Sequence, residues 1–163
     1  MNRAPTKAIL GRAPMTTLHA KAFHELTPLE VYRILQLRSA IFVVEQACAF
    51  QDIDDHDLLA VHVLTDARRD AALEGCVRVF GPGVTFPEAS FGRLATASSA
   101  RGSGLGRALV ARALGWIESH TPGPVRIAAQ SHLEAFYRAF GFGPVGEPYV
   151  EDGIPHVHMV RAR

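Results

Sequence analysis

The chain of 163 residues is 48% hydrophobic and 20% charged, which fits one domain with a sizeable core and excludes a disordered chain. Seventeen basic and sixteen acidic residues leave a net charge of +1, so no basic face for nucleic acid is indicated. No uncharged apolar run reaches the roughly 18 residues that a membrane span needs. Cys48 and Cys76 match neither a disulfide framework nor a zinc motif. We therefore expect a cytoplasmic protein with no metal, membrane or nucleic-acid partner.

The amino-terminal residues differ in composition from the rest of the chain. Residues 1–22 contain basic but no acidic side chains, and the first acidic residue is Glu25. They contain no apolar h-region, so they do not form a secretory signal. We expect residues 1–18 to be a disordered leader, or Met15 to be the true start, and residues 19–163 to form a single domain.

A first helix is predicted from residue 28, because Thr27 can cap it, Pro28 suits its first position and Glu30 completes a capping box. Arg38 falls in the apolar stripe of this helix, which contains Val31, Ile34, Leu35, Ile41 and Phe42. A guanidinium there is partly buried and needs an acidic partner, and several carboxylates follow it in the sequence. An arginine that extends to solvent at the helix edge is the alternative interpretation.

The remaining pattern alternates short strands with helices. Strands are predicted at residues 59–64, 75–80, 91–96, 125–130 and 156–160, the third interrupted by Arg93. A longer helix is predicted to begin at Leu105 and to stop at residues 121–124. A short one should open with a second capping box at Ser131 and end at Gly141. This order predicts an α/β or α+β sheet of mixed direction.

The loop Arg101-Gly102-Ser103-Gly104-Leu105-Gly106 separates the strand at 91–96 from the longer helix. Closely spaced glycines before a helix expose backbone N–H groups that, with the helix dipole, can bind a diphosphate. The spacing is not that of the dinucleotide-binding fingerprint, and the Walker A lysine is missing. Taken alone, the loop is equally well explained as a flexible turn.

The Arg-x-x-Gly-x-Gly pattern at 101–106, followed by Tyr137-x-x-x-Gly141-Phe142, resembles the paired signature of the GNAT superfamily of N-acyltransferases. Residues 35–38, 41–46, 51–54 and 151–156 are similar to those of its ElaA-type branch. The resemblance implies an α/β (α+β) GNAT fold: a mixed, largely antiparallel twisted sheet with a splayed central strand pair, flanked by helices. It also implies acetyl-CoA as co-substrate. Dimers are common in this superfamily, so a homodimer is compatible with it.

The implied activity is transfer of an acetyl group to a primary amine by direct attack, without a covalent enzyme intermediate. Tyr137 would be the general acid that protonates the departing thiolate, although its apolar neighbours also fit a core tyrosine. Gln130 stands where many members have Asn. The residues expected at the acetyl-CoA site are Leu94, Ala95, Thr96, Arg101, Gly102, Ser103, Gly104, Leu105, Gly106, Arg107 and Gln130.

The acceptor, a small-molecule or peptide amine, is less clearly indicated by the sequence. The acidic residues between Asp52 and Asp57 could attract a cationic amine or form a solvated loop, and they lack the spacing of an EF-hand. His62 is a candidate base but also fits a core histidine. The candidate acceptor-site residues are Arg38, Glu45, Asp52, His132 and His156.

Three other functions compete with this one. A CoA-binding regulatory module without turnover would keep the glycine loop but release no thiol, and an inert scaffold would not bind CoA. A further set of residues also resembles the acyl-homoserine-lactone synthases, which acylate S-adenosylmethionine: Arg38, Phe42, Glu45, Asp52 and Asp54. Those enzymes generally lack the Arg-x-x-Gly-x-Gly loop, which this chain has.

Overall fold

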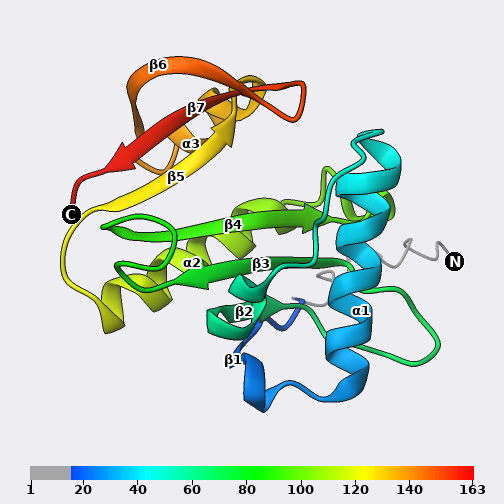
Figure 1. Cartoon of the computed structure of the whole chain (residues 1–163). Coiled ribbons are helices and arrows are strands. Elements are labelled where there is room, and N and C mark those ends of the chain that lie inside the picture. Colours follow the sequence, from blue (N-terminus) through cyan, green and yellow to red (C-terminus); the bar gives the residue numbers. More distant parts are fainter. Residues whose placement is uncertain (1–15) are drawn as a thin grey trace, which may run out of the picture.

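The computed structural model describes residues 16–163, so the leader expected at residues 1–18 falls almost entirely outside the described residues. Leu18 already packs against the main core. Within this range, seven strands form one sheet in the order β1-β2-β3-β4-β5-β7-β6 (Figure 1). Every neighbouring pair is antiparallel except β4–β5, as the mixed, largely antiparallel expectation requires. The strands are β1 (His19–Ala22), β2 (Val61–Leu64), β3 (Gly75–Phe80), β4 (Ala89–Thr96), β5 (Val125–Gln130), β6 (Gly143–Glu151) and β7 (Ile154–Arg161).

Two helices cover opposite faces of the sheet (Figure 1). Helix α1 (Pro28–Arg38) begins at the predicted capping box, in which the Glu30 amide donates to Thr27 Oγ1 over 3.2 Å. It continues into a π-helical segment, η2 (Ser39–Glu45). Helix α2 (Leu105–His120) lies on the other face. Adjacent strand residues face opposite sides, so Leu64 packs with α1 while Val63 packs with α2.

The third helix, α3 (Glu134–Arg138), starts differently from the prediction. Ser131 belongs to a 3₁₀ turn, Ser131–Leu133, and its buried hydroxyl makes no hydrogen bond, so the second capping box is wrong. Its end is as predicted, because Gly141 has a φ of +86° and its amide donates to the Arg138 carbonyl over 2.9 Å.

Strands β4 and β5 pair only at their beginnings, at Ala89–Val125 and Ser90–Arg126, and then diverge. A bulge in β4 accompanies this divergence, since Cys76 pairs with Ala95 while Arg78 pairs with Gly92. Two residues of β4, Arg93 and Leu94, therefore oppose one residue of β3. The splayed central pair is thus confirmed.

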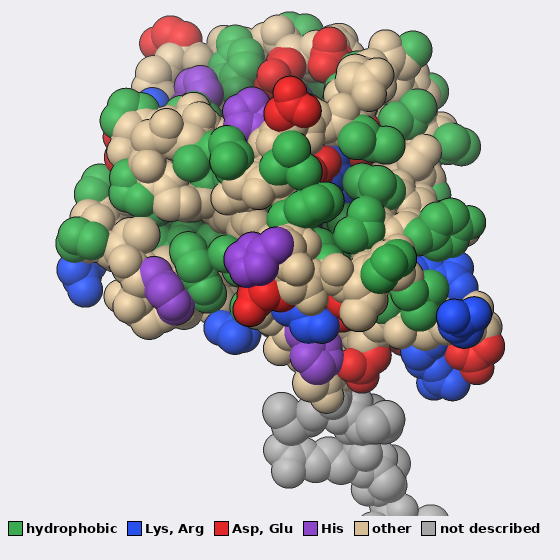
Figure 2. All heavy atoms as spheres, turned by 60° about the horizontal axis from the view of Figure 1, so that its bottom comes forward, with side chains coloured by type: hydrophobic (Ala, Val, Ile, Leu, Met, Phe, Trp, Pro, Cys, Tyr) green, Lys and Arg blue, Asp and Glu red, His purple; other side chains and the backbone are tan. Residues whose placement is uncertain are grey.

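The outer surface agrees with the near-zero net charge. On the face shown in Figure 2, acidic and basic side chains are interspersed among apolar ones, without an extended basic area. None of the helices in residues 16–163 is both long and apolar enough to cross a membrane.

Candidate active site

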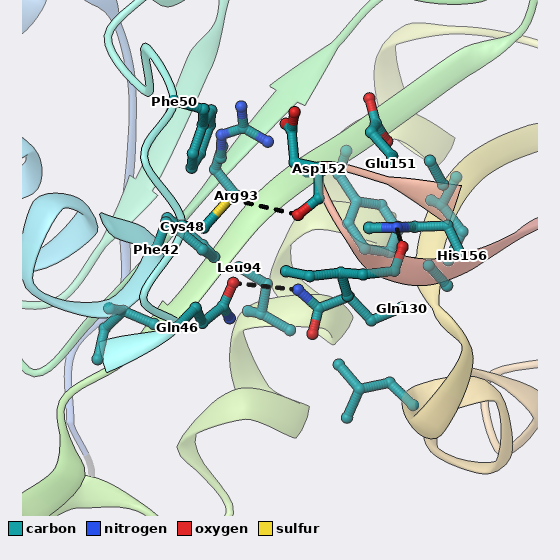
Figure 3. A pocket seen from close by; sticks show the side chains of 18 of the residues that line it. Phe42, Gln46, Cys48, Phe50, Arg93, Leu94, Gln130, Glu151, Asp152 and His156 are labelled. Atoms are coloured by element: carbon teal, nitrogen blue, oxygen red, sulfur yellow. Dashed lines mark hydrogen bonds between the residues drawn. The ribbon is translucent and has the colours of Figure 1, made fainter. Parts of the chain in front are cut away.

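A pocket open to solvent lies where β4 and β5 diverge. Residues 91–94 of β4 and residues 127–130 of β5 form two of its walls. The chain from η2 to Phe50 and the β6–β7 turn form its outer part (Figure 3). Because the two strands no longer pair there, their facing backbone groups are available to a ligand.

Tyr137 lies at the inner end of the pocket, on α3. Its ring packs against Phe91, Phe136 and Phe142, with ring centroids 6.1, 5.0 and 6.2 Å away. Burial raises the pKa of Tyr137 to about 12. The side chain is therefore both a core residue and a pocket residue, and its phenol is protonated at neutral pH.

Two weak contacts connect the elements on either side of the pocket (Figure 3). Gln130 Nε2, at the end of β5, donates to Gln46 Oε1 over 3.3 Å. Cys48 Sγ donates to the Asp152 carbonyl over 3.7 Å. The segment after η2 thereby contacts both β5 and the β6–β7 turn.

The glycine loop forms the amino-terminal end of α2. Gly104 is the N-cap with a φ of +89°, and Gly102 has a φ of +77°. A Cβ atom at either position would meet no atom within 4 Å, so open space surrounds both. The amides of Gly106 and Arg107 lie in the first turn, where helical N–H groups have no intrahelical partner. Free N–H groups at the start of a helix, with open space around them, can bind an anion.

Arg101 and Arg107 flank this loop, as predicted, but each already has a neighbour. Arg101 Nη2 lies 2.8 Å from a carboxylate oxygen of Glu45. The Arg107 guanidinium lies over the rings of Phe136 and Phe140, at 5.6 and 5.8 Å. Glu45 contacts the glycine loop and does not line the pocket.

The structure removes Arg38 from the candidate acceptor contacts. Its side chain is 0% exposed, and all three of its nitrogens are used within the protein. Nε donates to Asp52 Oδ2 over 3.0 Å, Nη2 donates to the Asp52 carbonyl over 2.7 Å, and Nη1 pairs with Asp57. The interpretation of Arg38 as a buried ion-pair residue is therefore the one that holds.

Asp52 is removed as well, because it lies buried between Arg38 and Arg93 and does not line the pocket. Three of the four carboxylates of the acidic loop pair with three arginines from α1, β3 and β4, so these three are not free to attract a cation, whereas Asp55 is exposed. The members of this ionic cluster are Arg38, Arg78, Arg93, Asp52, Asp54 and Asp57.

Of the three histidines considered, the pocket contains His156. Its Nδ1 lies 2.8 Å from the Ile154 carbonyl, an acceptor, so Nδ1 carries a proton and neutral His156 has a lone pair on Nε2. His132 is exposed and outside the pocket lining. His62 is buried away from this pocket with Nε2 2.9 Å from the Asp57 carbonyl, and burial lowers its pKa, as in a core histidine.

Among the expected acetyl-CoA residues on β4, Leu94 lines the pocket, whereas Ala95 is buried against the α1 face. Thr96 lies beside the glycine loop, 3.9 Å from where a Cβ on Gly106 would be. Several other residues line the pocket without having been assigned a role from their motifs, and they come from segments far apart in the chain: Gln46, Cys48, Phe50, Arg93, Glu151 and Asp152.

In residues 16–163, no group of three or more His, Cys, Asp or Glu side chains is placed to hold a metal ion.

A family profile described as an acetyltransferase (GNAT) domain matches residues 61–162. The chain belongs to this GNAT family.

Relatives place the chain within the family. It is 39% identical over 138 residues to protein ElaA of Escherichia coli (strain K12), covering 84% of this chain and 90% of that protein. The crystal structure of E. coli ElaA has a TM-score of 0.82 and 37% identity, covering 90% and 99% of the two chains. An acyl-CoA N-acyltransferase structure from Pseudomonas aeruginosa has a TM-score of 0.83 and 40% identity, covering 91% and 100%. The ElaA-type resemblance and the GNAT fold are confirmed.

A structure of the acyl-homoserine lactone synthase BjaI is 17% identical, with a TM-score of 0.71, covering 91% of this chain and 83% of that one. At this identity it shows a shared fold only. The present GNAT protein is an acyltransferase, and its family uses an acyl-CoA as co-substrate. The described residues fit that molecule, because free amides at the amino-terminal end of α2 can accept a phosphate and strands β4 and β5 leave facing backbone groups unpaired.

Proposed function

We propose that this GNAT protein transfers an acetyl group from acetyl-CoA to a primary amine by direct attack. One observation supports it above all: the pocket between β4 and β5 contains a buried, protonated tyrosine, and β4 ends at Thr96, beside the first turn of α2 with its free amides. When bound, acetyl-CoA would supply the activated acyl group. The pocket's outer end, where Glu151, Asp152 and His156 lie, would receive the amine.

The backbone would hold the donor. Amides of residues 102–107 would bind the pyrophosphate, and Arg101 and Arg107 would add positive charge. Backbone groups of Leu94 and Thr96 would pair with the pantetheine arm. A backbone amide of β4 near its bulge would donate to the thioester oxygen and stabilise its developing negative charge.

Two side chains would move protons. His156 Nε2 would take a proton from the attacking amine, directly or through water. Tyr137 would donate its phenolic proton to the thiolate as the carbon–sulfur bond breaks and the carbon–nitrogen bond forms. Solvent would then return a proton to Tyr137 and remove one from His156, which restores the starting state.

Gly106→Val is expected to weaken acetyl-CoA binding by at least roughly tenfold, because the new side chain would stand between α2, Thr96 and Phe136, where the donor would enter. The fold should tolerate it, since the Cβ makes only ordinary contacts and valine is no poorer a helix former than glycine. Calorimetric titration and thermal melting would measure the two effects. Gly115→Val, on the exposed side of the same helix, is the matched control. Equal affinity of both variants would count against the loop as the donor site.

Glu45→Gln is expected to strengthen acetyl-CoA binding by up to roughly fivefold, because an exposed ion pair of about 0.2–1 kcal/mol no longer competes for Arg101. The dissociation constant would be measured at low salt. Glu134→Gln, which breaks the exposed pair with Arg138, should leave it unchanged. Unchanged or weaker binding in Glu45→Gln would remove Arg101 from the donor site.

The activity itself is tested by thiol release from acetyl-CoA in the presence of a panel of primary amines, with S-adenosylmethionine included. Amine-dependent release with formation of the N-acetyl product is the expected result. Binding of acetyl-CoA without release for any amine would instead favour the regulatory module. Release with S-adenosylmethionine alone would favour the synthase-like activity.

A further inference from the structure

Arg93 is held rigidly at the wall of the pocket (Figure 3). Its Nε donates to Asp52 Oδ1 over 2.7 Å. Its guanidinium lies over two aromatic rings, 5.7 Å from the centre of Phe42 and 5.2 Å from that of Phe50. The side chain nevertheless keeps 31% of its surface exposed. These contacts fix its position before any ligand arrives.

The backbone of Arg93 is unusual for its residue type. Its φ is +51°, in the left-handed region that glycine or asparagine adopts far more easily. It is one of the two bulged residues of β4, and a bulge redirects the side chains that it carries. An arginine kept at a strained position, facing a pocket, indicates a role for its side chain there.

The guanidinium has unused donors. Arg38, in the same ionic cluster, uses all three nitrogens on Asp52 and Asp57. By contrast, within residues 16–163 Arg93 uses only Nε, and its two terminal nitrogens make no hydrogen bond or ion pair. These two nitrogens form the fork that binds a carboxylate through two parallel hydrogen bonds.

Two carboxylates also line this pocket. Glu151 and Asp152 lie at the β6–β7 turn, and neither forms an ion pair with another described residue. The Cys48 thiol contacts the Asp152 backbone and helps to position the turn. The pocket therefore offers a fixed cation and two free anionic groups to one occupant.

We infer that the acceptor is an amine that carries its own carboxylate, as an α-amino acid does. This inference rests on the proposed acetyl transfer and specifies its acceptor. The terminal nitrogens of Arg93 bind the carboxylate, while Glu151 and Asp152 attract the ammonium group toward His156. His156 takes one ammonium proton before attack, and the nitrogen releases a second proton to solvent as the amide forms. A polyamine without a carboxylate would instead place positive charge against Arg93 and leave the fork unpaired.

The test compares α-amino acids with the amines that lack only their carboxylate, as the ratio of kcat/KM for thiol release. The wild-type protein should prefer the carboxylate-bearing member by roughly 10- to 100-fold, the usual effect of a charged hydrogen-bonded pair. Arg93→Gln should abolish this preference and keep acetyl-CoA affinity. Arg93→Lys, which keeps the charge but not the fork, should retain part of it.

Arg78→Lys is the matched control, because Arg78 belongs to the same ionic cluster but does not line the pocket. It should lower stability and keep the preference for carboxylates. The inference would be overturned if the wild type used each α-amino acid and its carboxylate-free amine with equal kcat/KM, or if Arg93→Gln left the ratio of kcat/KM unchanged. Either result would leave the proposed acetyl transfer intact. Absence of thiol release with every amine, despite acetyl-CoA binding, would overturn acetyl transfer and this inference together.

Discussion

Replacing Tyr137 with phenylalanine is expected to lower kcat by roughly 10²- to 10⁴-fold, the usual contribution of a general acid, with little change in acetyl-CoA affinity. The phenylalanine ring keeps the packing against Phe91, Phe136 and Phe142, so the fold should persist. Because burial raises the pKa of Tyr137 to about 12, the wild-type phenol stays protonated at neutral and mildly alkaline pH. Steady-state kinetics of thiol release, together with calorimetric titration, would measure both parameters.

The exposed Tyr32 offers a matched control, since Tyr32→Phe removes a hydroxyl remote from the pocket lining and should leave kcat unchanged. A wild-type rate in Tyr137→Phe would remove the phenol from the mechanism. Loss of acetyl-CoA binding in the same variant would show that Tyr137 acts in binding rather than in proton transfer.

Arg38→Met is expected to lower the free energy of unfolding by about 3 kcal/mol, the lower end of the cost of removing one partner from a buried ion pair, because Asp52 and Asp57 then keep only Arg93 and Arg78 as partners. Methionine fills much of the arginine's volume, so the loss should come mainly from the ion pairs and hydrogen bonds that Asp52 and Asp57 no longer make with Arg38. Urea denaturation, monitored by the fluorescence of Trp116 and by circular dichroism, would measure it.

Arg68→Met is the control for this loss. Arg68 pairs with Asp70 at the surface, where water and salt screen the interaction, so its replacement should leave stability close to that of the wild type. Wild-type stability of Arg38→Met would contradict the structural role of the cluster. Normal stability with impaired use of amines would return Arg38 to the acceptor site.

Elements specified by local interactions could be predicted from the sequence. Thr27 and Glu30 satisfy backbone amides within one helical turn, so the start of α1 is readable from four residues. Strand β6 shows no alternation, contains two prolines and is mostly exposed; it forms because β7 pairs with it. The predicted start of α3 was wrong because Ser131 lies in a 3₁₀ turn that precedes the helix. The spacing of capping residues does not distinguish a 3₁₀ turn from the first turn of an α-helix.

The candidate site also has one part that local sequence predicts and one part that depends on the fold. The glycine loop and Tyr137 belong to local motifs, and the sequence identifies both. The part of the pocket proposed to receive the amine could not be predicted, because it depends on the order of strands in the sheet. This order brings the β6–β7 turn and residues 42–50 to the bulge of β4. Arg38 could be predicted to need an acidic partner, but the convergence of arginines from three elements on one acidic loop depends on the fold.

Calorimetric titration of the full chain with acetyl-CoA tests the central claim most directly. We expect saturable binding by the wild-type protein and by Gly115→Val, and binding weakened at least roughly tenfold in Gly106→Val. Absence of saturable binding by the wild-type protein would contradict the assignment of the glycine loop and the splayed strand pair to the donor, and the proposed acetyl transfer with it.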